Sequence, residues 1–157
     1  MKLNSVLTLL FIALFTVCKG GAYDLSGYGL KPDTGENASP LIAKALQEIA
    51  AEVNFDTVRI LLPKGRYDFY PEGASKREYF ISNHDQDNPK LVGLAFENMK
   101  NVIFDGQGSE LVFHGRMLPV SLVGSENCTL KNFSIDFANP HICLLYTSPS
   151  PRDRTRS

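Results

Sequence analysis

The chain repeats a stretch of its own sequence, and this repeat limits the folds open to it. Residues 94–106 match residues 120–132 at an offset of 26 residues, which pairs Leu94 with Val120 and Phe104 with Leu130. A second match, between residues 111–113 and 135–137, has an offset of 24. In each segment apolar residues alternate with other residues, as in a strand with one buried face. Short strands that repeat at such intervals predict an all-β fold, a solenoid in the form of a right-handed parallel β-helix.

An N-terminal α-helix is expected to cap this solenoid. Ser39 is predicted as its N-cap and Pro40 as its first helical residue. An apolar stripe at helical spacing follows over about four turns; its members are Ile42, Ala45, Leu46, Ile49 and Val53. Because the first turn of a solenoid exposes an apolar end, such a helix is a natural cover for it. Further strands are expected at residues 23–30, 58–62, 67–69 and 79–81, and the repeats at roughly 91–140.

The first 22 residues have the pattern of a secretory signal peptide. Lys2 precedes an apolar run over residues 6–17, and small residues follow, with cleavage expected after Gly20 or Ala22. The apolar run is too short for a comfortable membrane span, so we expect an exported protein, periplasmic or secreted, with no membrane span in the mature chain. Lipid attachment at Cys18 is the alternative, and the bulky Val17 before it argues against that.

Residues 143–157 do not continue the repeat pattern. The string 143–153 resembles the translation of a transposase adapter used to prepare sequencing libraries, which predicts a non-native tail; a natural tail rich in Pro, Ser and Arg is the alternative. One domain is then expected over residues 23–142. Residues 22–142 hold 11 Lys and Arg against 16 Asp and Glu, and this acidity argues against a nucleic-acid partner.

Several polar segments make the expected fold and function more specific. The order of strand, polar loop and capped helix resembles the opening of pectate-lyase-like proteins, and residues 81–90, 113–119 and 132–141 resemble bacterial α-1,3-galactosidases of glycoside hydrolase family 110. The resemblance implies an exo-acting enzyme that removes terminal α-1,3-linked galactose from glycans, with inversion and without a metal or other cofactor. It also implies a much longer chain, so that the catalytic carboxylates are expected beyond residue 142.

The candidate chemistry starts from the spacing of carboxylates. An inverting glycosidase holds its two carboxyl groups about 6.5–9.5 Å apart, whereas neighbouring strands lie only about 4.8 Å apart. An inverting pair must therefore skip a strand or face across a groove. Residues 91–142 show no such outward pair, since Val112 is the repeat partner of Asp136. The candidate substrate-binding residues are Asp136, His141, His114, Arg116, His84 and Asp85. Their alternative roles are solvated surface groups and hydrogen bonds between loops.

Other patterns have structural interpretations. Five phenylalanines fall mainly on the inward period and predict stacked rings in the core; they are Phe96, Phe104, Phe113, Phe133 and Phe137. Asn101 and Asn127 recur at one repeat position and predict an asparagine ladder. Residues 105–108 predict a turn that closes a strand. No metal-ligand spacing is present. The functional alternatives are a polysaccharide lyase or polygalacturonase on the same fold, or a non-catalytic glycan-binding β-helix.

Overall fold

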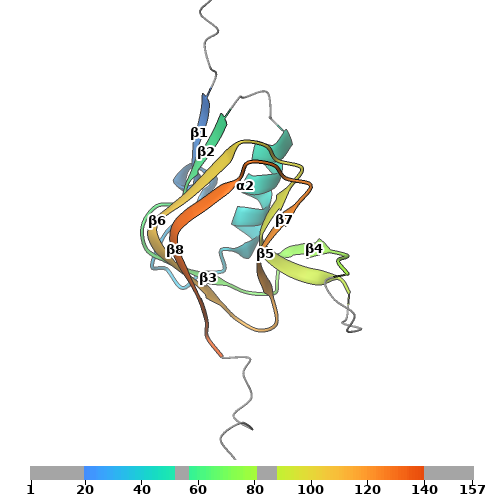
Figure 1. Cartoon of the computed structure of the whole chain (residues 1–157). Coiled ribbons are helices and arrows are strands. Elements are labelled where there is room, and N and C mark those ends of the chain that lie inside the picture. Colours follow the sequence, from blue (N-terminus) through green and yellow to red (C-terminus); the bar gives the residue numbers. More distant parts are fainter. Residues whose placement is uncertain (1–19, 52–56, 81–87, 140–157) are drawn as a thin grey trace, which may run out of the picture.

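A computed structural model describes residues 20–51, 57–80 and 88–139 of the chain. These residues form mainly strands, with a single α-helix among them (Figure 1). The elements are β1 (Gly20–Asp24), the 3₁₀ helix η2 (Leu25–Tyr28), α2 (Ser39–Ala51), β2 (Thr57–Leu61), β3 (Arg66–Phe69), β4 (Ser75–Arg77), β5 (Lys90–Glu97), β6 (Val102–Phe113), β7 (Leu118–Val123) and β8 (Thr129–Phe137).

The strands form two sheets that are almost entirely parallel. In the first sheet, β1 pairs with β2, and the long β6 pairs with β2, β3 and β8. In the second sheet, β5 pairs with β7 in parallel and with β4 in antiparallel. The sequence repeat sets the register, because Leu94 lies opposite Val120 and Phe104 opposite Leu130. The predicted pairing of the repeats is confirmed.

A two-residue insertion in β6 explains why the offset falls from 26 to 24. Asp105 pairs with Lys131 and Ser109 with Phe133, so β6 has three residues between these pairs where β8 has one. Gln107 at φ 51° and Gly108 at φ 86° hold the extra length in left-handed conformations. The predicted turn does not close the strand, because β6 continues beyond the insertion to Phe113.

Aromatic rings of successive strands pack on one another in the core, as predicted. The ring of Phe113 is fully buried and stacks on Phe69 with centroids 4.7 Å apart, and it packs against Phe137 at 6.0 Å. Phe104 meets Phe133 edge to face at 5.6 Å. Such contacts add stability beyond the apolar area they bury.

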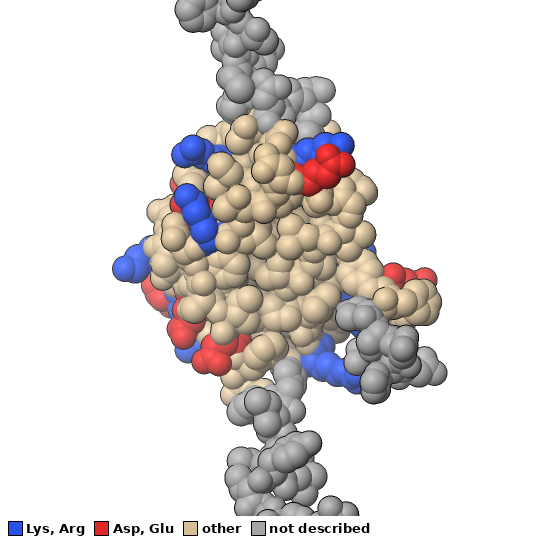
Figure 2. Space-filling model, in the orientation of Figure 1, with Lys and Arg blue, Asp and Glu red and all other residues tan. Residues whose placement is uncertain are grey.

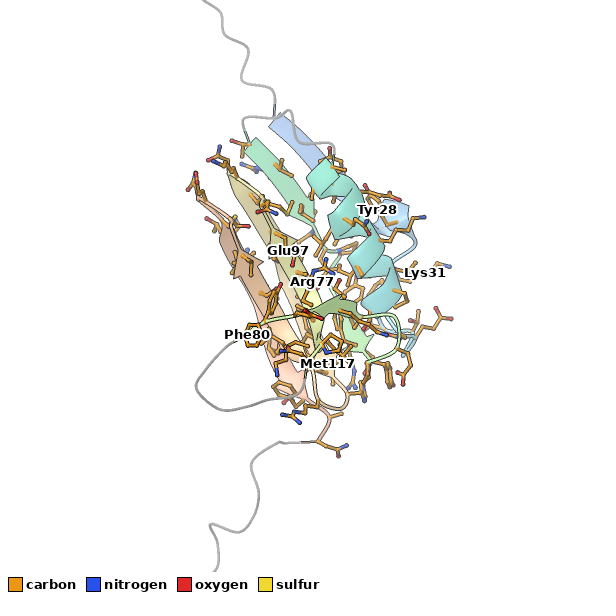
Figure 3. The ribbon with its side chains drawn as sticks, turned by 90° about the vertical axis from the view of Figure 1, so that its right-hand side faces the viewer. Tyr28, Lys31, Arg77, Phe80, Glu97 and Met117 are labelled. Atoms are coloured by element: carbon orange, nitrogen blue, oxygen red, sulfur yellow. The ribbon has the colours of Figure 1, made fainter. Side chains whose placement is uncertain are left out.

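Helix α2 covers one side of this core. Its residues Ile42, Ala45, Leu46 and Ile49 are all buried, which confirms the predicted stripe, while Val53 lies outside the described residues. The helix packs against β5 and η2. It lies on the side of the molecule opposite β8 (Figure 3).

The start of α2 differs from the prediction. The carbonyl of Ala38 accepts the first helical hydrogen bond, from Ile42 N, so Ser39 is not the N-cap. The side chain of Asn37 caps the helix, because its Oδ1 accepts a hydrogen bond from Ser39 N at 2.9 Å. The Ser39 hydroxyl instead donates to the carbonyl oxygen of Tyr70 at 2.7 Å and ties the helix to the end of β3.

Two other expectations are corrected. The strand predicted over residues 23–30 ends at Asp24, whose carboxylate accepts a hydrogen bond from Ser26 N and starts η2. Tyr79 and Phe80 lie outside any strand, and the short strand of this region is β4, upstream of them. Alternating hydrophobicity shows which face of a segment is buried. It does not show which of two adjacent short segments, residues 75–77 or 79–81, pairs with a neighbouring strand.

The face formed by β7 and β8 leaves apolar side chains uncovered, and we call it the open end. Leu122 is 49% exposed and Ile135 is 43% exposed, although their repeat partners Phe96 and Leu111 are fully buried. Among the residues that the structure describes, no charged side chain lies at the centre of this face, and Lys, Arg, Asp and Glu lie around its margin (Figure 2). Uncovered apolar surface of this kind favours contact with further protein.

Candidate functional site

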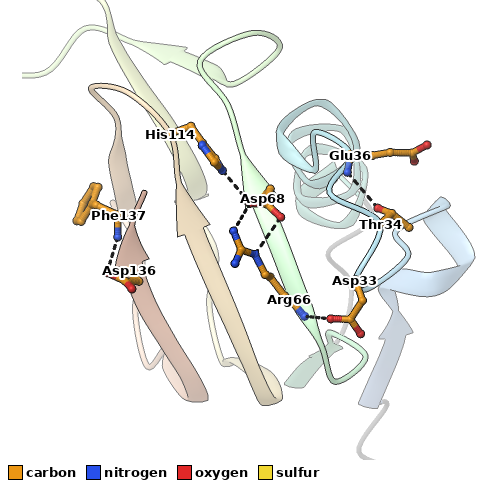
Figure 4. Close-up of polar contacts among 8 residues, drawn as sticks. All are labelled: Asp33, Thr34, Glu36, Arg66, Asp68, His114, Asp136 and Phe137. Carbon is orange, nitrogen blue, oxygen red and sulfur yellow. Dashed lines mark hydrogen bonds and ion pairs between the residues drawn. The ribbon is translucent and has the colours of Figure 1, made fainter. Parts of the chain in front are cut away.

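A polar cleft lies beside β3 and the end of β6, and we call it the Asp68 cleft (Figure 4). Its volume is about 440 Å³, within the range of about 300–1,000 Å³ typical of small-molecule sites. The lining residues are Asp33, Gly35, Arg66, Asp68, Tyr70 and His114.

Strand alternation brings most of these side chains together. Tyr67 and Phe69 of β3 are buried in the core, so Arg66, Asp68 and Tyr70 project from the opposite face. His114 directly follows β6, and its backbone N donates to the carbonyl oxygen of Phe69 at 2.8 Å. This bond continues the pairing of β3 with β6 and sets the imidazole beside Arg66 and Asp68 of β3 and beside Tyr70, which follows β3.

Asp68 lies at the centre of the cleft, and its side chain is only 6% exposed. Its Oδ1 accepts hydrogen bonds from Arg66 Nη2 at 2.9 Å and from His114 Nε2 at 2.7 Å, and its Oδ2 accepts from Arg66 Nε at 3.2 Å. The Arg66 guanidinium holds the pKa of Asp68 below its usual value; the His114 bond acts in the same direction, and burial opposes both. Asp68 is therefore ionised at neutral pH and is not a proton donor.

The other side chains of the cleft are held in fixed positions. The rings of Tyr70 and His114 stack with centroids 4.1 Å apart and planes 8° from parallel. Asp33 Oδ1 accepts a hydrogen bond from Arg66 N at 2.9 Å, which attaches the loop before α2 to the start of β3. The bond to the ionised Asp68 assigns the proton of His114 to Nε2.

Asp136, a predicted site residue, lies in the same row as Asp68. Asp68 pairs with Val112, and Val112 pairs with Asp136, so the two carboxylates lie on alternate strands. Two strand spacings are about 9.6 Å, which is close to the separation in inverting glycosidases. Within such a pair, an ionised Asp68 does not fit the role of the acid that protonates the leaving oxygen. Asp136 is exposed, and its Oδ1 accepts a hydrogen bond from Phe137 N.

The remaining predicted site residues divide into two groups. His114 lines the Asp68 cleft, whereas Arg116, two residues further on, is exposed and does not line it. His84, Asp85 and His141 lie outside the described residues. Among the described residues, no group of three or more His, Cys, Asp or Glu side chains is arranged to hold a metal ion.

A second polar cluster lies on the other sheet. Glu97 Oε1 accepts hydrogen bonds from Arg77 Nε at 2.6 Å and from the Tyr79 hydroxyl at 2.7 Å, and that hydroxyl lies 3.3 Å from Ser121 Oγ. Figure 3 shows Arg77 and Glu97 side by side. The Arg77 bond lowers the pKa of Glu97, so this carboxylate is also held ionised. The neighbouring Phe80 is 94% exposed beside a cavity of about 520 Å³.

Sequence reasoning missed Arg66, Asp68 and Tyr70. Their signal is present in residues 66–70, where two buried aromatic positions alternate with an arginine, an aspartate and a tyrosine. A strand whose exposed face carries complementary charges indicates a polar site on that face. The partner His114 is 46 residues from Asp68, and only the register of β3 on β6 brings them together.

The similar proteins found by comparison with known sequences are named α-1,3-galactosidases. No family model matches the chain. An α-1,3-galactosidase B of Phocaeicola vulgatus is 58% identical over 144 residues, which cover 90% of this chain and 24% of that protein. An α-1,3-galactosidase B of Parabacteroides distasonis is 62% identical over 121 residues, 76% of this chain and 20% of that protein. An α-1,3-galactosidase A of Shewanella woodyi is 41% identical over 119 residues, 76% of this chain and 19% of that protein.

These matches cover 76–90% of the chain, as the resemblance in the polar segments implied. The described part of the chain contains no helix that is both long and apolar enough to cross a membrane. The chain spans between a fifth and a quarter of the length of the curated relatives from Phocaeicola vulgatus and Parabacteroides distasonis. Over most of its residues, the chain is thus a relative of the bacterial α-1,3-galactosidases.

Proposed function

We propose that this chain is the N-terminal part of an exported glycoside hydrolase that removes terminal α-1,3-linked galactose from glycans. The observation that carries the proposal is its identity of 56–62% to proteins named α-1,3-galactosidase B. The fold supplies a scaffold for such an enzyme, but fold alone does not set function, so the substrate rests on the relatives.

The proposed architecture is a right-handed parallel β-helix that continues beyond β8. The in-register parallel pairs β5–β7 and β6–β8 support this, as does the uncovered apolar surface of the open end. Residues 1–22 are proposed as an export signal. Cleavage after Gly20 fits β1 better than cleavage after Ala22, because Gly21 and Ala22 pair with Val58 and Arg59.

The proposed chemistry is hydrolysis with inversion and without a metal. A protonated carboxyl group donates to the leaving oxygen, and a second carboxylate activates a water molecule on the opposite face of the sugar. Asp68 does not fit the acid role, because Arg66 and His114 stabilise its ionised form. We propose that the catalytic carboxylates lie beyond residue 142, in later turns of the solenoid, since the chain matches only 20–24% of the length of its relatives.

The test is the longer gene product. It should release galactose from galactosyl-α-1,3-galactose and not from the α-1,4 or α-1,6 isomers, and it should keep this activity in EDTA. Proton NMR during the reaction should show the β-anomer of galactose first, because inversion of an α-linkage gives the β-product. Initial release of the α-anomer would overturn the proposed mechanism, and cleavage of none of the isomers would overturn the proposed activity.

The isolated segment provides a second test. Residues 23–142 alone should release no galactose and should bind hydrophobic dyes, because the open end is uncovered and the catalytic pair is absent. Turnover comparable with that of the longer protein would contradict both arguments, that the catalytic pair is absent from this segment and that the uncovered open end prevents stable folding.

The tail after residue 142 is proposed to be foreign to the gene. The genomic sequence should diverge from the chain at this point. A genomic clone that reads through Ile142 into the same residues 143–153 would overturn this proposal.

A further inference from the structure

We propose that the Asp68 cleft is a binding site for a neutral sugar residue. In this proposal Arg66, His114, Tyr70 and Asp33 contact the sugar, and Asp68 is the positioning residue that holds Arg66 and His114. The choice of a saccharide as ligand rests on the proposed function; the features that make the cleft a binding site come from its own geometry.

The first argument is that the cleft is preorganised. Both oxygens of Asp68 are used in fixing its neighbours, with two hydrogen bonds from Arg66 and one from His114. The imidazole is also stacked on Tyr70, and the backbone of Arg66 is bonded to Asp33. Side chains held in this way lose little conformational entropy when a ligand binds.

The second argument is that polar atoms of the cleft remain available. Arg66 Nη1, His114 Nδ1, Tyr70 Oη and Asp33 Oδ2 each have no hydrogen-bond partner among the described residues. This set combines a donor, Arg66 Nη1, with two acceptors, Asp33 Oδ2 and His114 Nδ1, and with the Tyr70 hydroxyl, which can both donate and accept. Such a combination matches sugar hydroxyl groups, because each hydroxyl both donates and accepts.

The third argument concerns charge. The cleft contains two carboxylates, Asp33 and Asp68, and one guanidinium, that of Arg66. Even a protonated His114 brings the sum only to zero, so the cleft offers no excess positive charge to a uronate or a sialic acid. A neutral hexose avoids repulsion from the carboxylates, and the cleft volume of about 440 Å³ is adequate for one.

The experiment uses the longer protein that carries this segment, with isothermal titration of lactose as a neutral saccharide that has no α-1,3-linked galactose to lose. Arg66→Gln should weaken lactose binding at least tenfold, and Tyr70→Phe, which removes a single hydroxyl, should weaken it several-fold. Arg59→Gln is the matched control, because Arg59 is an exposed arginine on the same sheet and does not line the cleft. It should leave the isotherm unchanged.

Melting midpoints accompany each isotherm, and if Arg66→Gln fails to fold, Tyr70→Phe alone decides. Absence of lactose binding by the unaltered protein, equal affinity in all variants, or tighter binding of galacturonate than of lactose would overturn the proposal. Failure of the galactosidase assay leaves these isotherms interpretable, so the two proposals fail independently.

Discussion

The side-chain amide of Asn127 donates a 2.7 Å hydrogen bond to the amide oxygen of Asn101, which lies one sequence repeat earlier. Both residues adopt left-handed backbone conformations, with φ of 52° and 54°. The predicted asparagine ladder is therefore present. Asparagine suits this position for two reasons, because it tolerates positive φ better than most residues and supplies a donor and an acceptor on one side chain.

Replacement of Asn127 separates these two contributions. Asn127→Gly keeps the left-handed backbone and removes the hydrogen bond, so it should cost about 1 kcal/mol of unfolding free energy. Asn127→Ala should cost about 1–2 kcal/mol more, because alanine is strained in that conformation. Urea denaturation of the longer protein measures both variants. Equal stability of the Gly and Ala variants would contradict the conformational argument.

Helix α2 should depend on its buried stripe. Ile49 is 1% exposed, and Ile49→Asp should destabilise the protein by several kcal/mol because it places a carboxylate against apolar surface. Gln47→Asp introduces the same charge at an exposed position of the same helix and is the control. An unchanged melting midpoint for Ile49→Asp would show that the helix does not stabilise the core.

Gly93 should tolerate no side chain. A Cβ at this buried position would overlap the ring of Phe113 and lie 3.0 Å from the carbonyl oxygen of Pro119. Gly93→Ala should therefore lower the unfolding free energy by about 1–3 kcal/mol. Gly27→Ala, where nothing lies within 4 Å of the added atom, is the matched control and should change stability little. The same loss in both variants would indicate a cause other than overlap.

The Asp68 hydrogen bonds should make stability depend on acid pH. Because the pKa of Asp68 is lower in the folded state, its contribution is complete above the unfolded-state pKa of about 3.9 and disappears as the pH falls through the folded-state value. Asp68→Asn should therefore destabilise the protein at pH 7 by about 1–3 kcal/mol. The gap to the unaltered protein should narrow below about pH 4.

Urea midpoints at pH 7, 5, 4 and 3 measure this dependence. Asp136→Asn is the control, since that carboxylate is exposed in the same row of the sheet, and it should cost little at pH 7. A gap between Asp68→Asn and the unaltered protein that stays constant from pH 7 to pH 3 would contradict the linkage.

The repeats could be predicted because paired residues are separated by a constant number of positions in the sequence. Leu94 and Val120, or Phe104 and Leu130, are recognisable as partners by their common offset and their alternation. The Asp68 cleft could not be predicted in this way, because Asp33, Asp68 and His114 come from three separate segments with no common period. These residues come together because β3 pairs with the second half of β6. The second half of β6 is open to β3 because β2 pairs only with the first half.

The role of Ser39 was wrong for a related reason. Serine favours N-cap positions in general, but the backbone of Asn37 pairs with Asp68, which places the asparagine side chain at the helix start. The N-cap preferences of amino acids indicate which residues can cap a helix. The pairing of distant segments determines which of these residues lies at the helix start.

The two extra residues of β6 also bear on how such a chain can change during evolution. They are accommodated between Asp105 and Ser109, and the pairs on both sides, Phe104 with Leu130 and Leu111 with Ile135, keep their partners. Because the extra residues are confined to this corner of β6, one repeat can be longer than the next without a change in the pairing of the strands. Insertions at the exposed residues 107–108 should therefore be inherited without disturbing the packed interior, and this corner is a place where related chains can acquire new surface loops.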